Sequence, residues 1–143
     1  MKLDLDRYNE IMKMRTFRLM VFIISIWATI ILTRLITFFI PTFFFELAGN
    51  HVHHYAYGIL VMIISGTSLI FLDGVYKDLG IPFFGAGVGM VVDEYAFVIA
   101  GDEIGYSSKL TIMTIIALSG VIVFLARYFQ KFSDVKGKEE TIE

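Results

Sequence analysis

Four long apolar stretches restrict what this sequence can fold into. They cover residues 19–40, 51–72, 81–100 and 110–126 approximately, and each supplies the roughly 20 residues that a helix needs to cross a bilayer. Hydrophobic residues make up 57% of the 143-residue chain, more than a soluble domain of this length can bury. We therefore expect an all-α, polytopic membrane protein. Residues 1–143 would form one domain with four transmembrane helices in a bundle, short polar tails and the lipid bilayer as partner.

The Lys and Arg residues outside the spans predict an orientation. Ten of them lie in the two tails or between the second and third spans, whereas one, Lys109, lies on the opposite side. Basic residues concentrate on the cytoplasmic side of membrane proteins, so both termini are expected in the cytoplasm and the protein in the cell membrane. We expect the first span to be retained, because no short apolar core with a small-residue cleavage site follows the charged N-terminal residues.

Composition excludes several classes of site. The chain has no Cys, so disulfides and thiolate metal sites are ruled out. Its net charge of −2 shows no basic excess, and the basic residues are divided between the two tails. We therefore expect no nucleic-acid partner.

Ionisable residues from three spans are expected at one depth. With a rise of about 1.5 Å per residue, Arg34, Asp93 and Glu94 lie roughly 9–10 Å below the outer ends of their spans, and His54 lies roughly 5 Å below. Charges in hydrocarbon need a partner or water, so an ion pair between Arg34 and Asp93 or Glu94 is expected. Two alternatives stay open: Arg34 reaching the headgroups, and a purely structural salt bridge. Adjacent helical residues point about 100° apart, so one carboxylate would pair with Arg34 and the other would bind a ligand.

All three histidines lie together, at His51, His53 and His54. With Asn50 as a candidate N-cap, His51 and His54 would share one helix face, the spacing of a chelating pair, and His53 would point elsewhere. The predicted metal ligands are His51, His53, His54, Asp93, Glu94, Asp102 and Glu46. Nitrogen and oxygen ligands without sulfur suit a divalent transition metal ion: zinc, iron, manganese or nickel. Histidines that only bind headgroups or loop backbone are the alternative.

Glycines are expected to bring the helices close enough for such a site. Gly58 lies one turn after His54, and Gly85, Gly87 and Gly89 lie in the third span. We expect these glycines to let the second and third spans touch. Gly85 and Gly89 have the spacing of a helix-association motif, which makes them a candidate surface for a homo-oligomer.

These motifs resemble those of a family of small, uncharacterised prokaryotic integral membrane proteins with four helices. The resemblance covers about residues 30–110. It is carried by Arg34 in the first span, by His51, His53, His54 and Gly58 as HxHHxxxG, and by Gly85 to Glu94 as GxGxxxxxDE, followed by the acidic Asp102 and Glu103. It implies that Arg34, the histidines, Asp93, Glu94 and Asp102 act as one unit, and it implies no particular activity.

Three functions fit the sequence. The first is a His/carboxylate metal site near the outer membrane face; an open coordination position would let the metal activate water, as in a membrane metalloenzyme. The second is an ion or proton transporter or channel, although the inner halves of the spans offer hydroxyl groups and no charged residue. The third is a structural accessory subunit in which the polar cluster holds the helices together.

Overall fold

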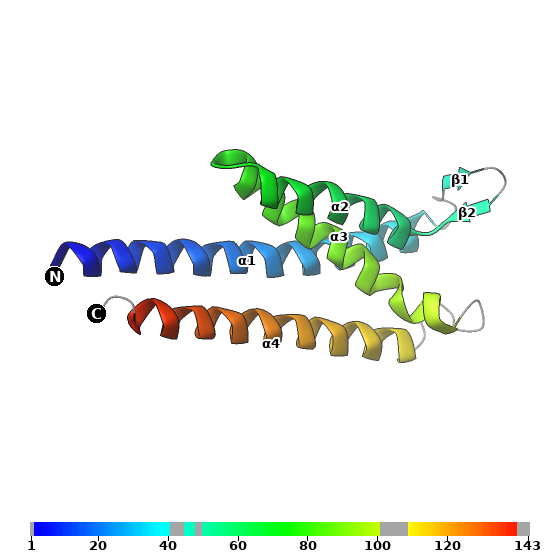
Figure 1. Cartoon of the computed structure of the whole chain (residues 1–143). Helices are drawn as coiled ribbons and strands as arrows, with labels where there is room; N and C mark the ends of the chain where they lie inside the picture. Colours follow the sequence, from blue (N-terminus) through cyan, green and yellow to red (C-terminus); the bar gives the residue numbers. More distant parts are fainter. Residues whose placement is uncertain (1, 41–44, 48–49, 101–108, 140–143) are drawn as a thin grey trace.

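The fold is a bundle of four helices with one small β-hairpin (Figure 1). The computed structural model describes residues 2–40, 45–47, 50–100 and 109–139. In chain order the elements are α1 (Lys2–Phe39), β1 (Phe45–Leu47), β2 (Asn50–Val52), α2 (His54–Phe71), α3 (Val75–Ala100) and α4 (Lys109–Glu139). All four helices are long and apolar enough to cross a membrane, which confirms the expected helical membrane architecture.

Three of the four helices, α1, α3 and α4, are longer than the apolar stretches that predict them, whereas α2 is shorter. The charged residues expected to form polar tails are largely helical, because α1 begins at Lys2 and α4 ends at Glu139.

The connection between α2 and α3 is shorter than the expected linker over 73–80. It consists of residues 72–74, and Gly74 has a φ of 62°, a conformation that glycine adopts without steric cost. The Asp78 N–H donates to the Gly74 carbonyl at 3.2 Å, and Pro82 lies inside α3. Asp78 is therefore in the first turns of α3 rather than in a loop.

The helix α3 occupies the middle of the bundle and contacts α1, α2 and α4. Figure 1 shows α1 and α4 running alongside each other, with the start of α1 and the end of α4 at the same end of the bundle. The hairpin lies at the opposite end, where α1 leads toward α2. The start of α1 and the end of α4, at opposite ends of the sequence, thus lie at the same end of the bundle.

The burial pattern is the reverse of that of a soluble protein. Large apolar side chains are exposed along all four helices, for example Ile24, Ile64, Phe83 and Phe124. Buried polar residues include Thr33, Ser65, Asp93, Glu94, Thr111 and Ser119. Ser and Thr hydroxyls donate hydrogen bonds to backbone carbonyls of the preceding helical turn; Ser65, for example, donates to the Val61 carbonyl at 2.6 Å. The interior also holds a small apolar core of Ile26, Ile30, Val92 and Ile115, so the mark of a lipid solvent is the apolar exterior.

Candidate functional site

Two adjacent carboxylates of α3 are buried at the end of the bundle nearest the hairpin. Asp93 is 0% exposed and Glu94 is 4% exposed. Because they are neighbours on a helix, their side chains leave α3 in different directions. Asp93 reaches α1, and Glu94 reaches the start of α2.

Asp93 is held by two consecutive residues of α1. The Arg34 Nε donates to Asp93 Oδ1 at 2.6 Å, and the Arg34 Nη2 lies 3.4 Å from the Asp93 carbonyl oxygen. The Thr33 hydroxyl lies 3.0 Å from Asp93 Oδ2. This contact is the predicted ion pair, and both of these Arg34 contacts with α3 are made to Asp93. The Arg34 side chain keeps 23% exposure.

Glu94 joins α3 to the N-terminus of α2. Its Oε2 accepts the Tyr55 backbone N–H at 2.8 Å, and its Oε1 lies 3.1 Å from the Nδ1 of His54. The Nδ1 of His53 lies 3.6 Å from the same Oε1. His53 is the N-cap residue of α2 but makes no side-chain capping bond, so the Glu94 carboxylate supplies the capping acceptor that the first turn needs. A negative charge also suits this end of a helix.

Glycines set the distance between α3 and its neighbours. A Cβ on Gly58 would lie 2.7 Å from the Gly87 carbonyl oxygen, and a Cβ on Gly87 would lie 2.7 Å from the Gly58 carbonyl oxygen. This reciprocal contact of α2 with α3 confirms that glycine lets these helices touch. It lies one to two turns from His54 and Glu94, so it sets how closely they approach.

The expectation that Gly85 and Gly89 bring the third span against the second is wrong. A Cβ at either position would lie 2.7 Å from a backbone carbonyl oxygen of α1, that of Phe22 for Gly85 and that of Ile26 for Gly89. These glycines therefore bring α3 onto α1, not onto α2. Within one chain α1 covers both glycines, and the association of two copies stays a prediction.

The histidines differ from the prediction in two ways. His51 belongs to β2, and α2 begins at His54, so His51 and His54 do not share a helix face and Asn50 is not the N-cap. His53 does not point away, because its ring nitrogen approaches Glu94 beside that of His54. The physical cause is the hairpin, whose strand pairing keeps residues 50–52 extended.

Two of the remaining predicted ligands, Glu46 and His51, lie in the strands of the hairpin. The strands are antiparallel, and their register places the backbone of Glu46 opposite that of His51. Asp102 and Glu103 lie outside the described residues. The structure thus brings together Arg34, His53, His54, Asp93 and Glu94 in one cluster.

Sequence reasoning missed Thr33 and the backbone of Tyr55. A threonine before Arg34 carries no distinctive signal, since Thr hydroxyls are common inside membrane helices. The capping role of Glu94 had a usable signal: a helix expected to start in the membrane needs acceptors for its first N–H groups.

Formal charges leave the cluster one positive charge short. Arg34 balances one of the two carboxylates, so with both imidazoles neutral the side chains of Arg34, Asp93 and Glu94 sum to −1. Over a quarter of each imidazole is exposed, 29% for His53 and 28% for His54, so a solute can reach this side of Glu94. The arrangement can therefore accept one cation, either a proton or a metal ion, next to Glu94.

The described residues contain no group of three or more His, Asp or Glu side chains arranged to hold a metal ion as the atoms stand. The Nδ1 atoms of His53 and His54 each lie within 3.6 Å of Glu94 Oε1, and imidazole nitrogen and carboxylate oxygen are atom types that bind transition metals. The resemblance drawn from the sequence motifs stays a prediction. Comparison of the chain with protein-family models, with curated proteins and with solved structures finds no match.

Proposed function

We propose that this chain is a small integral membrane protein that binds one divalent transition metal ion beside Glu94. The single observation that carries the proposal is the convergence of two imidazole nitrogens on one carboxylate oxygen. The Nδ1 atoms of His53 and His54 lie 3.6 and 3.1 Å from Glu94 Oε1. Two ligands of a tetrahedral ion, each about 2.0–2.1 Å from the metal, are about 3.3 Å apart. The two observed nitrogen–oxygen spacings lie on either side of that value.

We propose Glu46 and His51, whose backbones are paired across the hairpin, and Asp102 as the candidates for completing the coordination. The absence of Cys favours zinc, iron, manganese or nickel over copper(I). If one position stays open to water, the bound metal lowers the pKa of that water and makes it a nucleophile toward an amphiphile such as a lipid headgroup.

The proposed location of the site is the outer face of the cell membrane. The shared end of α1 and α4 carries most of the basic residues, and the positive-inside tendency assigns that end to the cytoplasm. The hairpin end, with Glu94 and the histidines, would then face outward. Membership of the resembled four-helix family is part of the same proposal.

Metal analysis of the purified protein tests the proposal. We expect about one zinc, iron, manganese or nickel ion per chain, retained through gel filtration in detergent and lost in His53→Ala/His54→Ala and in Glu94→Gln. Glu10→Gln is the matched control, because Glu10 is exposed on α1 far from the cluster, and it should retain the metal. Metal-free protein that takes up none of the four ions on titration would refute the proposal.

One observation favours a second candidate, an accessory subunit in which the cluster only joins helices. Glu94 Oε2 already caps α2 through the Tyr55 N–H, a role that needs no ligand. In that case Glu94→Ala lowers stability while neither it nor wild-type protein binds metal. Ion or proton flux in liposomes that disappears in Asp93→Asn would instead favour a transporter.

A further inference from the structure

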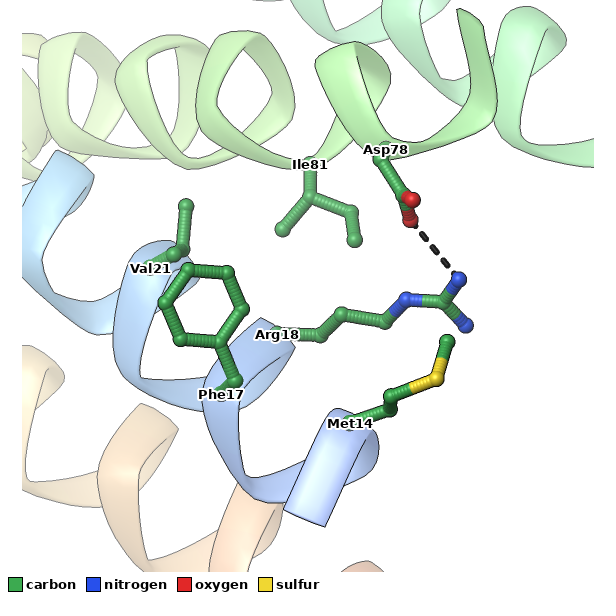
Figure 2. Close-up of a pocket in the computed structure, with 6 residues that line it drawn as sticks. All are labelled: Met14, Phe17, Arg18, Val21, Asp78 and Ile81. Carbon is green, nitrogen blue, oxygen red and sulfur yellow. Dashed lines mark ion pairs between the residues drawn. The ribbon is translucent and has the colours of Figure 1, made fainter. Parts of the chain in front are cut away.

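A groove between α1 and α3 lies at the other end of the bundle from Glu94. It has a volume of about 130 Å³, several times the roughly 30 Å³ that one water molecule occupies in the liquid. Its lining residues are Met14, Phe17, Arg18, Val21, Asp78 and Ile81 (Figure 2). Four of the six are apolar, and the two charged residues face each other.

The groove lies at a membrane boundary. Arg18 is 21 residues before Phe39, the end of α1, and Asp78 is 22 residues before Ala100, the end of α3. At a rise of about 1.5 Å per residue these intervals are about 32 and 33 Å, close to the roughly 30 Å thickness of the hydrocarbon core. The charged pair is therefore at headgroup level when the other helix ends are at the opposite boundary.

The pair is open at the rim of the groove. The Arg18 Nη2 lies 2.7 Å from Asp78 Oδ1, with 37% and 50% of the two side chains exposed. Figure 2 shows the Arg18 side chain reaching toward Asp78, while Phe17, Val21 and Ile81 lie away from its guanidinium. A guanidinium has five N–H donors and a carboxylate two acceptor oxygens, so each group can engage a second partner while the pair persists.

We propose that this groove binds the headgroup of a zwitterionic phospholipid with a primary ammonium, of the phosphatidylethanolamine type. The phosphate accepts from Arg18, the ammonium donates to Asp78, and the first acyl segment lies against Phe17, Val21 and Ile81. The headgroup has one negative and one positive group next to each other, which matches the Arg18–Asp78 pair in reverse. A phosphatidylglycerol headgroup brings no cation to Asp78, and a choline headgroup has no N–H to donate.

Native mass spectrometry of the detergent-purified chain tests this proposal. Phosphatidylethanolamine, phosphatidylglycerol and phosphatidylcholine with identical acyl chains are added in equal amounts. We expect wild-type protein to retain phosphatidylethanolamine preferentially, and Arg18→Gln to lose that retention. Asp78→Asn should lower phosphatidylethanolamine retention roughly tenfold, as expected for one lost charge-assisted hydrogen bond, and favour phosphatidylglycerol.

Matched variants separate lipid recognition from loss of structure. Asp73→Asn removes an exposed carboxylate near the same end, and Lys13→Gln removes a cation of α1; neither residue lines the groove, and both variants should keep the wild-type lipid preference. Asp78→Glu restores the carboxylate and should restore the preference if Asp78→Asn acts through charge. Equal retention of the three lipids by wild-type protein, or an unchanged preference in Asp78→Asn, would overturn the proposal. Neither result depends on metal binding at Glu94.

Discussion

The pair formed by Arg34 and Asp93 allows the sharpest test of how this bundle is held together. We consider the single variants Arg34→Met and Asp93→Asn and the double variant that combines them. Each single variant leaves a polar group of the opposite residue without its charged partner, whereas the double variant removes both charges. The double variant should therefore be more stable than either single variant.

The sizes follow from burial. Removing one partner of a buried ion pair costs about 3–5 kcal/mol, while replacing both by neutral groups is often nearly neutral. Asp93 is 0% exposed, so Arg34→Met should cost toward the upper part of that range. Arg34 keeps 23% exposure, so Asp93→Asn should cost about 3 kcal/mol. We expect the double variant to lie within about 1 kcal/mol of wild type.

Equilibrium unfolding in mixed micelles, followed by circular dichroism, measures these differences. The Arg18–Asp78 pair is the control, because its side chains are 37% and 50% exposed; Arg18→Gln and Asp78→Asn should each cost less than about 1 kcal/mol. A double variant at Arg34 and Asp93 that loses the sum of the two single losses would refute the reasoning, since additivity means that the residues do not interact.

Two further predictions concern the contacts of α2. Gly58→Ala should destabilise the protein by about 1–3 kcal/mol and weaken metal retention, because the new Cβ would lie 2.7 Å from the Gly87 carbonyl oxygen. The control Gly120→Ala, whose Cβ would meet nothing within 4 Å, should be neutral or stabilising by up to about 1 kcal/mol. Equal effects of the two variants in unfolding assays would contradict this prediction. Glu94→Ala should lower the free energy of unfolding by about 1–2 kcal/mol, because it removes the acceptor for the Tyr55 N–H, whereas Glu94→Gln keeps an oxygen there. Hydrogen exchange at the Tyr55 amide should accelerate in Glu94→Ala. Unchanged exchange would show that Glu94 does not cap α2.

The four helices and one half of the site could be predicted from the sequence. A bilayer requires long apolar helices, so hydropathy locates them well. It also makes rare charges conspicuous, and the equal depths of Arg34 and Asp93 were enough to predict the pair that the structure confirms. The argument that adjacent carboxylates take different partners also holds, because Glu94 faces the histidines instead of Arg34.

The start of α2 could not be predicted in this way. Asn50 followed by His51 has the local signals of a helix N-terminus, but residues 50–52 pair with residues 45–47. Strands of three residues are too short for periodicity to reveal. The helix consequently begins three residues later than expected, at His54, and its first turn is capped by a carboxylate from another helix rather than by its own N-cap side chain.

The sequence held enough information to avoid the wrong expectation that all the glycines of the third span face the second span. Residues two apart on a helix point about 200° from each other, and residues four apart point about 40° from each other. Gly87 must therefore face away from Gly85 and Gly89, which makes α3 a helix with two close neighbours. The structure shows this division, with Gly87 against α2 and the other two against α1. Which neighbour lies on which side depends on tertiary packing, which no local pattern specifies.

The orientation of α3 about its own axis couples the Asp93 half of the cluster to the Glu94 half. Arg34 and Thr33 hold Asp93 toward α1, and because Glu94 is the next residue on a rigid helix, that contact also fixes the direction in which Glu94 leaves α3. The Gly58–Gly87 contact then sets the distance from Glu94 to His54. A variant at Asp93 can thus disturb a ligand at Glu94 without touching it, whereas Glu94→Gln changes the ligand atoms and leaves the Asp93 pair in place. Metal retention that falls in both Asp93→Asn and Arg34→Met would identify Asp93 as a positioning residue, because Arg34→Met breaks the contact with α1 but keeps the carboxylate. Metal retention that is lost in Asp93→Asn and kept in Arg34→Met would make Asp93 a ligand.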